Sequence, residues 1–288
     1  MLKEHEKLSL IIPAYNEEEA IEETVIKTNN ELRRLNIGYE IIVVNDGSKD
    51  RTAEILKKFD FIKVVNNPYN LGYGASLKRG IKSASGDWIM IIDSDGTYPI
   101  EETDRLLKDV GDYDMVVGKR RTDVDHFGRR PAKWILKKIA SFVSGHQIPD
   151  LNSGMRIFRK KIALEFFHLF PKGFSFTSTI TLACFARDYT VKYTDINYFK
   201  RKGKSGIRPK HFFDFIALIF KLFFYFKPLK ALTPACLIIF LLGLAKLIRD
   251  YILEGHIGIL AALLIIFSIQ LFFMALVSEV IIKSGPSR

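Results

Sequence analysis

Short apolar runs alternate with amphipathic stretches along the first two-thirds of the chain. The apolar runs predict buried strands at 8–12, 39–44, 61–65, 88–93 and 114–117. The amphipathic stretches predict helices at 17–35, 51–59, 73–83 and 101–110. In the first of these helices, Ile21, Val25 and Leu32 fall on one face and form a stripe for burial. Strands that alternate with helices predict an α/β fold whose sheet is mostly parallel and doubly wound.

The pattern becomes less regular after residue 120. It predicts helices at 132–143, 160–169 and 176–187, a short strand at the end of 151–158, and another at 191–197. We expect this second half to form the acceptor side of a cleft.

Three apolar segments dominate the remainder of the chain. The first, 212–226, mixes apolar with charged residues, which predicts a helix lying in the membrane interface. The others, 232–248 and 257–282, hold about 17 and about 26 residues with one charge each, and a bilayer span needs roughly 20. We therefore predict an α/β domain at 1–210, an interfacial helix at 211–230 and a transmembrane hairpin at 231–288.

Charge on either side of the hairpin predicts its orientation. Lys227 and Lys230 precede the first span, and Lys283 and Arg288 follow the second. The connecting segment 249–256 holds one Arg, one Asp and one Glu, a net charge of −1. Because positively charged flanks stay in the cytoplasm, we expect an integral membrane protein whose α/β domain and both chain ends are cytoplasmic. The N-terminal residues also lack the apolar stretch of a signal peptide.

Polar residues follow three of the predicted strands. Asp93, Ser94 and Asp95 end the strand at 88–93, Asp46 follows the strand at 39–44, and 15–17 follows the first strand. Ligands bind at the carboxyl ends of strands in open α/β sheets, so these residues predict a nucleotide site. Two carboxylates one residue apart suit Mg²⁺ or Mn²⁺ holding a diphosphate. In the alternative reading, one aspartate caps the next helix and the other is solvated.

The net charge of +11 comes from 43 Lys and Arg residues against 32 Asp and Glu residues. Much of the excess lies in two clusters, 119–138 and 200–210. A basic surface suits nucleic acid, anionic membranes or phosphorylated substrates. We expect membrane lipids and phosphorylated substrates as partners and no nucleic acid; a merely solvated basic face is the alternative for each cluster.

Two familiar phosphate-binding motifs are incomplete in this sequence, because each lacks a required glycine. Gly72 and Gly74 could begin a dinucleotide fingerprint, but Leu77 stands where its third glycine belongs. The run 203–205 imitates the end of a phosphate-binding loop, but Tyr198 replaces the upstream glycine. A redox or nucleotide-hydrolysing enzyme is therefore disfavoured.

Several motifs together resemble those of family 2 glycosyltransferases with the GT-A fold. The sugar-donor motifs are Pro13-Ala14-Tyr15-Asn16-Glu17, Asn45-Asp46-Gly47-Ser48 and Asp93-Ser94-Asp95-Gly96. The segments 151–158 and 198–205 resemble those of the polyprenyl-phosphate branch, which includes dolichol-phosphate mannose synthases and undecaprenyl-phosphate glycosyltransferases. The resemblance covers roughly residues 8–210, and a two-span tail is also similar to members of that branch.

The resemblance and the chemistry together suggest roles for individual residues. The expected nucleotide-sugar-binding residues are Pro13, Tyr15, Glu17, Asp46, Gly72, Asp93 and Ser94. The expected metal ligands are Asp93 and Asp95, which with Arg156 are also the expected catalytic residues. The expected phosphate- or acceptor-binding residues are Arg121, Arg156, Arg201 and Lys204.

The chain departs from the family pattern at two positions. Asn45 stands where many relatives have Asp, and Thr97 stands where some dolichol-phosphate mannose synthases place a metal-binding Gln. The chain also lacks the Gln-X-X-Arg-Trp motif of processive polysaccharide synthases. A cellulose- or chitin-like synthase is therefore disfavoured.

The expected reaction is inverting transfer of a hexose from a nucleotide-diphosphate sugar, of the GDP-mannose or UDP-glucose type, to dolichyl or undecaprenyl phosphate. Such a lipid phosphate is already anionic, so it needs cations to hold it and no general base. The main alternative acceptor is a hydroxyl group, as in a lipid-linked oligosaccharide, with Asp150 as base. A nucleotidyltransferase and a non-enzymatic membrane scaffold are weaker alternatives, and homo-oligomerisation stays open.

Overall fold

The computed structural model describes residues 2, 3, 5–121, 138, 140, 141, 144–173, 175–199 and 210–284. The chain divides into two compact units, Met1–Leu218 and Ile219–Arg288. Most of the helix expected at 132–143 lies outside the described residues.

The first unit is built on a seven-stranded sheet. Its strands are β1 (Leu8–Ala14), β2 (Tyr39–Asn45), β3 (Ile62–Asn66), β4 (Trp88–Ile91), β5 (Met115–Arg120), β6 (Arg156–Arg159) and β7 (Val191–Ile196). Its helices are α1 (Ile21–Arg34), α2 (Thr52–Leu56), α3 (Tyr73–Ser83), the 3₁₀ turn η1 (Ile100–Glu102), α4 (Thr103–Lys108), α6 (Lys160–Glu165) and α7 (Phe176–Ala186).

The strand order is β3-β2-β1-β4-β6-β5-β7. Strands β1 to β4 pair in parallel, as do β5 and β7, whereas β6 runs antiparallel to both of its neighbours, β4 and β5. The expected mostly parallel α/β sheet is confirmed. The antiparallel insertion of β6 was not expected, and it brings the loop before β6 to the edge where β4 ends.

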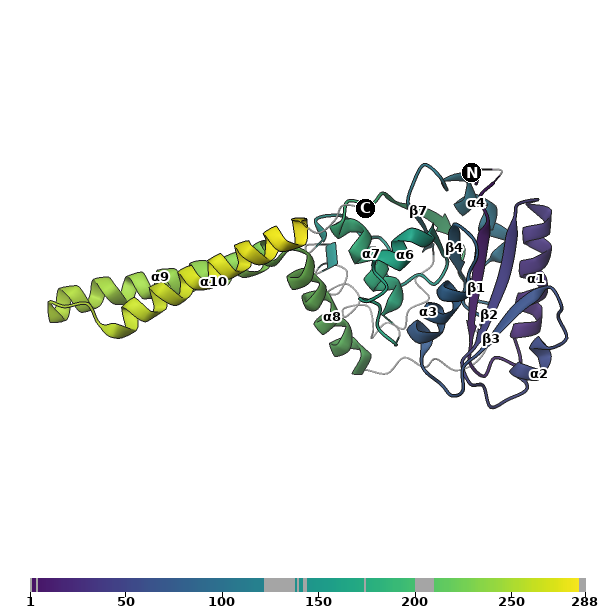
Figure 1. The fold of residues 1–288 in the computed structure, drawn as a ribbon, viewed down its shortest axis with the longest axis horizontal. Coiled ribbons are helices and arrows are strands. Elements are labelled where there is room, and N and C mark those ends of the chain that lie inside the picture. The colour runs from purple at the N-terminus through teal and green to yellow at the C-terminus, as the bar shows by residue number, and fades with distance from the viewer. Residues whose placement is uncertain are drawn as a thin grey trace. The chain divides into compact units, whose positions relative to one another are not determined.

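Helices α1 and α3 cover opposite faces of the sheet (Figure 1). The even-numbered apolar residues of β1 share a core with α1, and the other face holds Ile11 against Gly80 of α3. The first strand continues two residues beyond its expected end, through Pro13. The amide of Ile92 donates a hydrogen bond to the carbonyl of Ile11, so the backbone of Ile11 faces β4. Pro13 lies two residues further along and faces the same side, but β4 has already ended there. Its missing N–H therefore leaves no hydrogen bond of the sheet unmade.

The C-terminal helices are α8 (Lys210–Phe226), α9 (Pro228–Glu254) and α10 (Ile259–Ser284). Helices α9 and α10 are long and apolar enough to cross a membrane. The loop predicted at 249–256 begins too early in the sequence, because α9 continues to Glu254. The next residue, Gly255, ends the helix with a left-handed φ of 68°. An ion pair between Lys246 and Asp250, one turn apart, lets charged residues stay helical.

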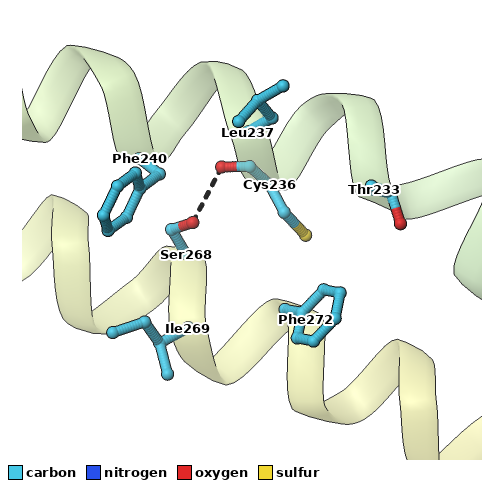
Figure 2. Close-up of a pocket in the computed structure, with 7 residues that line it drawn as sticks. All are labelled: Thr233, Cys236, Leu237, Phe240, Ser268, Ile269 and Phe272. Carbon is cyan, nitrogen blue, oxygen red and sulfur yellow. Dashed lines mark hydrogen bonds between the residues drawn. The ribbon is translucent and has the colours of Figure 1, made fainter.

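The two long helices pack closely through small residues. A Cβ on Gly243 would lie 2.9 Å from Cγ1 of Ile265, and Ala261 and Ala275 are fully buried. The Ser268 hydroxyl donates a hydrogen bond of 2.7 Å to the carbonyl of Cys236, across a small, mainly apolar pocket (Figure 2). The hairpin is thus a packed unit in its own right.

Candidate active site

The loops that follow β1 and β2 are joined by hydrogen bonds at the carboxyl edge of the sheet. The amide of Asn16 donates to Ser48 Oγ at 3.1 Å, and the amide of Lys49 donates back to Asn16 Oδ1 at 2.8 Å. The amide of Glu17 donates to Thr52 Oγ1 at 3.0 Å. These bonds fix a wall in which Tyr15 is 39% exposed, so its ring is available to a ligand.

Asp46 lies at the end of β2 and is only 4% exposed. Its Oδ1 accepts from Asn67 Nδ2 at 2.5 Å and from the amide of Leu71 at 2.9 Å. Its Oδ2 accepts from the amide of Gly72 at 2.9 Å. Asp46 therefore organises the 67–72 loop, and a carboxylate oxygen can accept two bonds, so Oδ2 keeps one further acceptor position.

Asp93 and Asp95 follow β4 at the same edge. Tyr73 Oη donates to Asp93 Oδ1 at 2.9 Å. Thr97 donates to Asp95 Oδ1 twice, at 2.7 Å from its hydroxyl and 3.1 Å from its amide. Thr97, which stands where some relatives place a metal-binding Gln, thus holds Asp95 in place. Between the two aspartates, the carbonyl of Ser94 accepts from a threonine hydroxyl of α1 at 3.2 Å.

The antiparallel register of β6 explains what covers Asp93. Ile91 pairs with Arg156, so continuing the register by two residues sets Gly154 opposite Asp93. A Cβ on Gly154 would lie 2.7 Å from Cγ of Asp93, so only glycine leaves room for the carboxylate. The amide of Gly154 in turn donates to Tyr98 Oη at 2.6 Å.

Gly72 and Gly74, which we expected to let a nucleotide approach the backbone, lie against another segment of the chain. A Cβ on Gly72 would lie 2.7 Å from the carbonyl oxygen of Lys172, and Gly72 has a φ of 98°. The amide of Gly74 donates to Gly173 at 3.1 Å, and that of Ala75 donates to Lys172 at 3.0 Å. The glycines thus let α3 begin against the 171–173 backbone; a nucleotide contact at Gly72 stays a prediction.

Arg156 lies elsewhere than the expected phosphate site. Its side chain is fully buried. Its guanidinium donates to backbone carbonyls and to one hydroxyl, those of Leu151, Ser153, Thr177 and Thr181. Burial lowers the pKa of Arg156. We correct its role from phosphate binding to holding the 151–153 loop against α7, because a fully buried guanidinium does not reach a ligand in the cleft.

Asp150, the candidate base for a hydroxyl acceptor, forms an ion pair with Arg120. Arg120 donates from Nε at 2.7 Å and from Nη2 at 2.8 Å, one bond to each carboxylate oxygen. Burial raises the pKa of Asp150, but the hydrogen bonds and the charge of Arg120 outweigh it, so the pKa is lowered. A carboxylate with a lowered pKa is a weak base.

The remaining expected cations are only partly described. Arg121 is exposed just after β5, and its amide donates to Ile196 at 2.9 Å. Arg201 and Lys204 lie outside the described residues. Their assignment to phosphate groups stays a prediction.

The carboxylates at this edge suit a divalent ion that the phosphates of a substrate help to bind. Among the described residues, no three His, Cys, Asp or Glu side chains gather as a metal site. Mg²⁺ is commonly held by one or two carboxylates plus substrate phosphates. Asp93 and Asp95 would supply two hard oxygen ligands from the segment that follows β4, which fits that pattern.

Sequence reasoning gave no role to several residues of this part of the structure: Asn67, Tyr73, Tyr98, Arg120 and Gly154. Tyr73 and Gly154 carried a signal, since each stands within a glycine-containing motif noted in the sequence. Their contacts depend on the strand order and on the direction of β6, which local patterns do not encode.

Comparison with known proteins gives matches over both units. A family model described as Glycosyl transferase family 2 matches residues 9–167, and one described as GtrB C-terminal hairpin matches residues 227–283. The second match bears out the expected helical hairpin.

Two curated relatives share a lipid-phosphate acceptor in their names. An undecaprenyl-phosphate 4-deoxy-4-formamido-L-arabinose transferase of Proteus mirabilis is 31% identical over 162 residues, covering 54% of this chain and 50% of that protein. A dolichol-phosphate mannosyltransferase of Pyrococcus furiosus is 30% identical over 233 residues, covering 75% of this chain and 63% of that protein. The matches thus span 50% and 63% of these relatives' own length.

A solved structure shares the fold. Glucosyl-3-phosphoglycerate synthase from Mycobacterium tuberculosis, in complex with Mn²⁺, uridine diphosphate and phosphoglyceric acid, aligns with a TM-score of 0.62 and 17% identity. The alignment covers 76% of this chain and 79% of that chain. Because the family model spans more than half of the chain and the sheet has the matching architecture, this protein belongs to glycosyl transferase family 2.

Proposed function

We propose that this protein transfers a hexose, with inversion at the anomeric carbon, from a nucleotide-diphosphate sugar to a polyprenyl phosphate at the cytoplasmic face of a membrane. The observation that carries the proposal is the convergence of Asp46, Asp93 and Asp95 at one edge of the sheet. The relatives support the acceptor, since their names give different sugars but a polyprenyl phosphate in each case.

The nucleoside binds between the loops after β1 and β2. Tyr15 and Pro13 form the wall of the base pocket, and Asp46 Oδ2 accepts one hydrogen bond from a ribose hydroxyl or a base N–H. The remaining acceptor positions of Asp46 hold its own loop. The backbone of Glu17 is tied to Thr52, and its carboxylate is proposed to face the same pocket.

Asp93 and Asp95 hold a divalent ion, Mg²⁺ or Mn²⁺, together with the diphosphate of the sugar donor. When bound, such an ion neutralises the charge that develops on the departing diphosphate. The structure supports this assignment through the rigid placement of both carboxylates, each of which accepts a hydrogen bond from a hydroxyl group close in space.

The acceptor reaction needs cations and no base. An oxygen of the lipid phosphate forms the new bond to the anomeric carbon while the bond to the nucleoside diphosphate breaks, and the diphosphate leaves with the electron pair. Arg121, Arg201 and Lys204 would attract and orient the incoming phosphate. The lowered pKa of Asp150 disfavours the alternative hydroxyl acceptor, which requires a base.

The hairpin of α9 and α10 anchors the enzyme where its lipid acceptor resides. The lysines that flank α9 on the side of the α/β domain support a cytoplasmic orientation of that domain. Helix α8 is proposed to lie in the membrane interface, since it combines aromatic residues with scattered charge.

The direct test uses the full chain in detergent micelles with Mn²⁺. Labelled GDP-mannose and UDP-glucose are supplied in parallel, each with a polyprenyl phosphate or with the matching polyprenol, which lacks the phosphate. We expect label in the lipid fraction only when the phosphate is present. Transfer to the polyprenol or to a soluble sugar, without transfer to the lipid phosphate, would overturn the proposal.

A further inference from the structure

One short loop touches both acidic sites of the sheet edge. Residues 67–72 bind Asp46 through the Asn67 side chain and the amides of Leu71 and Gly72. The next residue, Tyr73, donates its hydroxyl hydrogen bond to Asp93. The loop therefore bridges the end of β2 and the end of β4, which are separated in the sheet by β1.

The position of Tyr73 is itself well determined. It is the first residue of α3, whose next two amides, those of Gly74 and Ala75, donate to the backbone carbonyls of Gly173 and Lys172. The backbone that carries the Tyr73 side chain is therefore held in place at the start of α3.

Gly154 confines the same carboxylate from another side. Its Cα lies so close to Asp93 that a Cβ there would sit 2.9 Å from Oδ1. Its amide is held by Tyr98 Oη at 2.6 Å. Asp93 therefore has a fixed orientation, set by a hydrogen bond from α3 and by steric contact with the loop before β6.

From this arrangement we infer that Tyr73 is a positioning residue that orients the Asp93 carboxylate for binding a divalent ion and so couples the nucleoside-binding loop to the metal site. The inference rests on the proposed function, because it takes Asp93 as a metal ligand. A neutral hydroxyl donor suits this task, since it fixes one carboxylate oxygen without cancelling the negative charge that attracts the cation. A lysine or arginine in its place would compete with the metal.

The test removes only the hydroxyl group, with Tyr73→Phe in the full chain in detergent micelles. Binding of Mn²⁺ is followed by loss of the electron paramagnetic resonance signal of the unbound ion, with UDP or GDP present. Partners that orient a metal ligand typically contribute 10- to 100-fold in affinity, so we expect Mn²⁺ binding to weaken by about tenfold or more. Unchanged Mn²⁺ affinity would overturn the inference.

The matched control is Tyr189→Phe. Tyr189 Oη donates to a carboxylate oxygen of Glu165 at 2.6 Å. This variant therefore removes a tyrosine–carboxylate bond of the same kind outside the proposed substrate site. We expect Mn²⁺ affinity like that of the wild type. An equal loss in both variants would show that Tyr73 acts only through general stability, and would overturn the inference.

A double-mutant cycle with Asp93→Glu separates the inference from the proposal beneath it. The longer side chain keeps a carboxylate for Mn²⁺ but moves it relative to the Tyr73 hydroxyl. If Tyr73 acts through Asp93, Tyr73→Phe changes Mn²⁺ affinity by less than about twofold in the Asp93→Glu background. Additive losses would contradict the inference and leave the proposed function intact. A wild-type protein that takes up no Mn²⁺ with either nucleotide would overturn both.

Should Tyr73→Phe fail to fold, Gly154→Ala answers the same question from the opposite side. The three atoms nearest to the added methyl group all belong to the Asp93 carboxylate, which the methyl group therefore displaces. Weakened Mn²⁺ binding in a folded Gly154→Ala protein supports the fixed orientation of Asp93, and full affinity rejects it.

Discussion

The edge of the sheet and the helical hairpin each place a carboxylate beside a glycine, but a neutral side chain donates to the first and a charged one to the second. In the hairpin, Asp250 is 1% exposed. Each of its two carboxylate oxygens accepts a hydrogen bond from Lys246 Nζ, at 2.7 and 2.8 Å. At the sheet edge, Asp93 accepts from the neutral hydroxyl of Tyr73. Gly258 and Gly154 leave room for the two carboxylates in the same way.

The comparison sets a carboxylate paired within the fold beside one that we propose to bind a metal ion. A cation on the adjacent turn of α9 compensates the charge of Asp250 near Gly258. At Asp93, the Tyr73 hydroxyl orients the carboxylate without adding a positive charge. The position of a carboxylate beside a glycine therefore does not indicate its function unless the charge of its hydrogen-bond donor is also known.

The largest expected effect comes from removing a carboxylate charge at the sheet edge, and the same change in the hairpin serves as its control. Asp95→Asn should lower the turnover of sugar transfer by about 10³-fold or more, because a divalent ion contributes several kcal/mol to stabilising the leaving group. Asp250→Asn, the matched change in the hairpin, should leave turnover per folded molecule near the wild-type value. Initial rates at saturating lipid phosphate measure both; near-normal turnover in Asp95→Asn would remove the metal assignment.

The two glycines provide a smaller and sharper contrast. Gly154→Ala should lower turnover by roughly 10- to 100-fold by displacing Asp93, whereas Gly258→Ala presses on Asp250 and should lower the thermal midpoint in detergent with little effect on turnover. Rates and unfolding midpoints are measured on the same samples. The comparison fails if both variants lose only stability, or if Gly258→Ala is the one that loses turnover.

The smallest expected effect concerns Asp150. Asp150→Asn should lower turnover by less than about threefold, because a lipid phosphate needs no base, whereas loss of a general base costs roughly 10²- to 10⁴-fold. Rates are compared well below the unfolding temperature of the variant. A loss in the range of a missing base would favour a hydroxyl acceptor.

The same variant has a defined pH signature in stability. The pKa of Asp150 is lowered in the folded protein by Arg120, so the ion pair stabilises the protein above the unfolded pKa of about 4 and is lost as the pH falls through the folded value. The difference in thermal midpoint between wild type and Asp150→Asn should therefore be widest above about pH 4 and shrink below it. A difference that is constant with pH would mean that the pair contributes nothing.

Much of the fold follows from local patterns. The first four strands and α3 lie where hydrophobic periodicity placed them, within two residues at most ends. Non-local pairing does not follow: β6 enters the sheet antiparallel, and only that direction brings Gly154 to Asp93. The end of α9 was also missed, because an ion pair and a left-handed glycine, rather than hydrophobicity, decide where the helix stops.

The site shows the same division. The positions of Asp46, Asp93 and Asp95 could be inferred because each lies within about four residues of the end of a strand. Arg156 could not be placed from the sequence, since only the packing of α7 against the loop before β6 shows that its guanidinium is buried among carbonyls. Tyr73 was hidden because its partner lies 20 residues away in the sequence.

Asp93 and Asp95 are proposed to bind the sugar donor through a shared divalent ion. Calorimetric titration of the full chain with UDP and GDP, with and without Mn²⁺, measures this directly. We expect one nucleotide to bind at least about tenfold more tightly with Mn²⁺ in the wild-type protein, and we expect Asp93→Asn and Asp95→Asn to abolish this gain. Binding of equal strength without the ion, or a gain that survives both substitutions, would show that the two aspartates hold no shared ion.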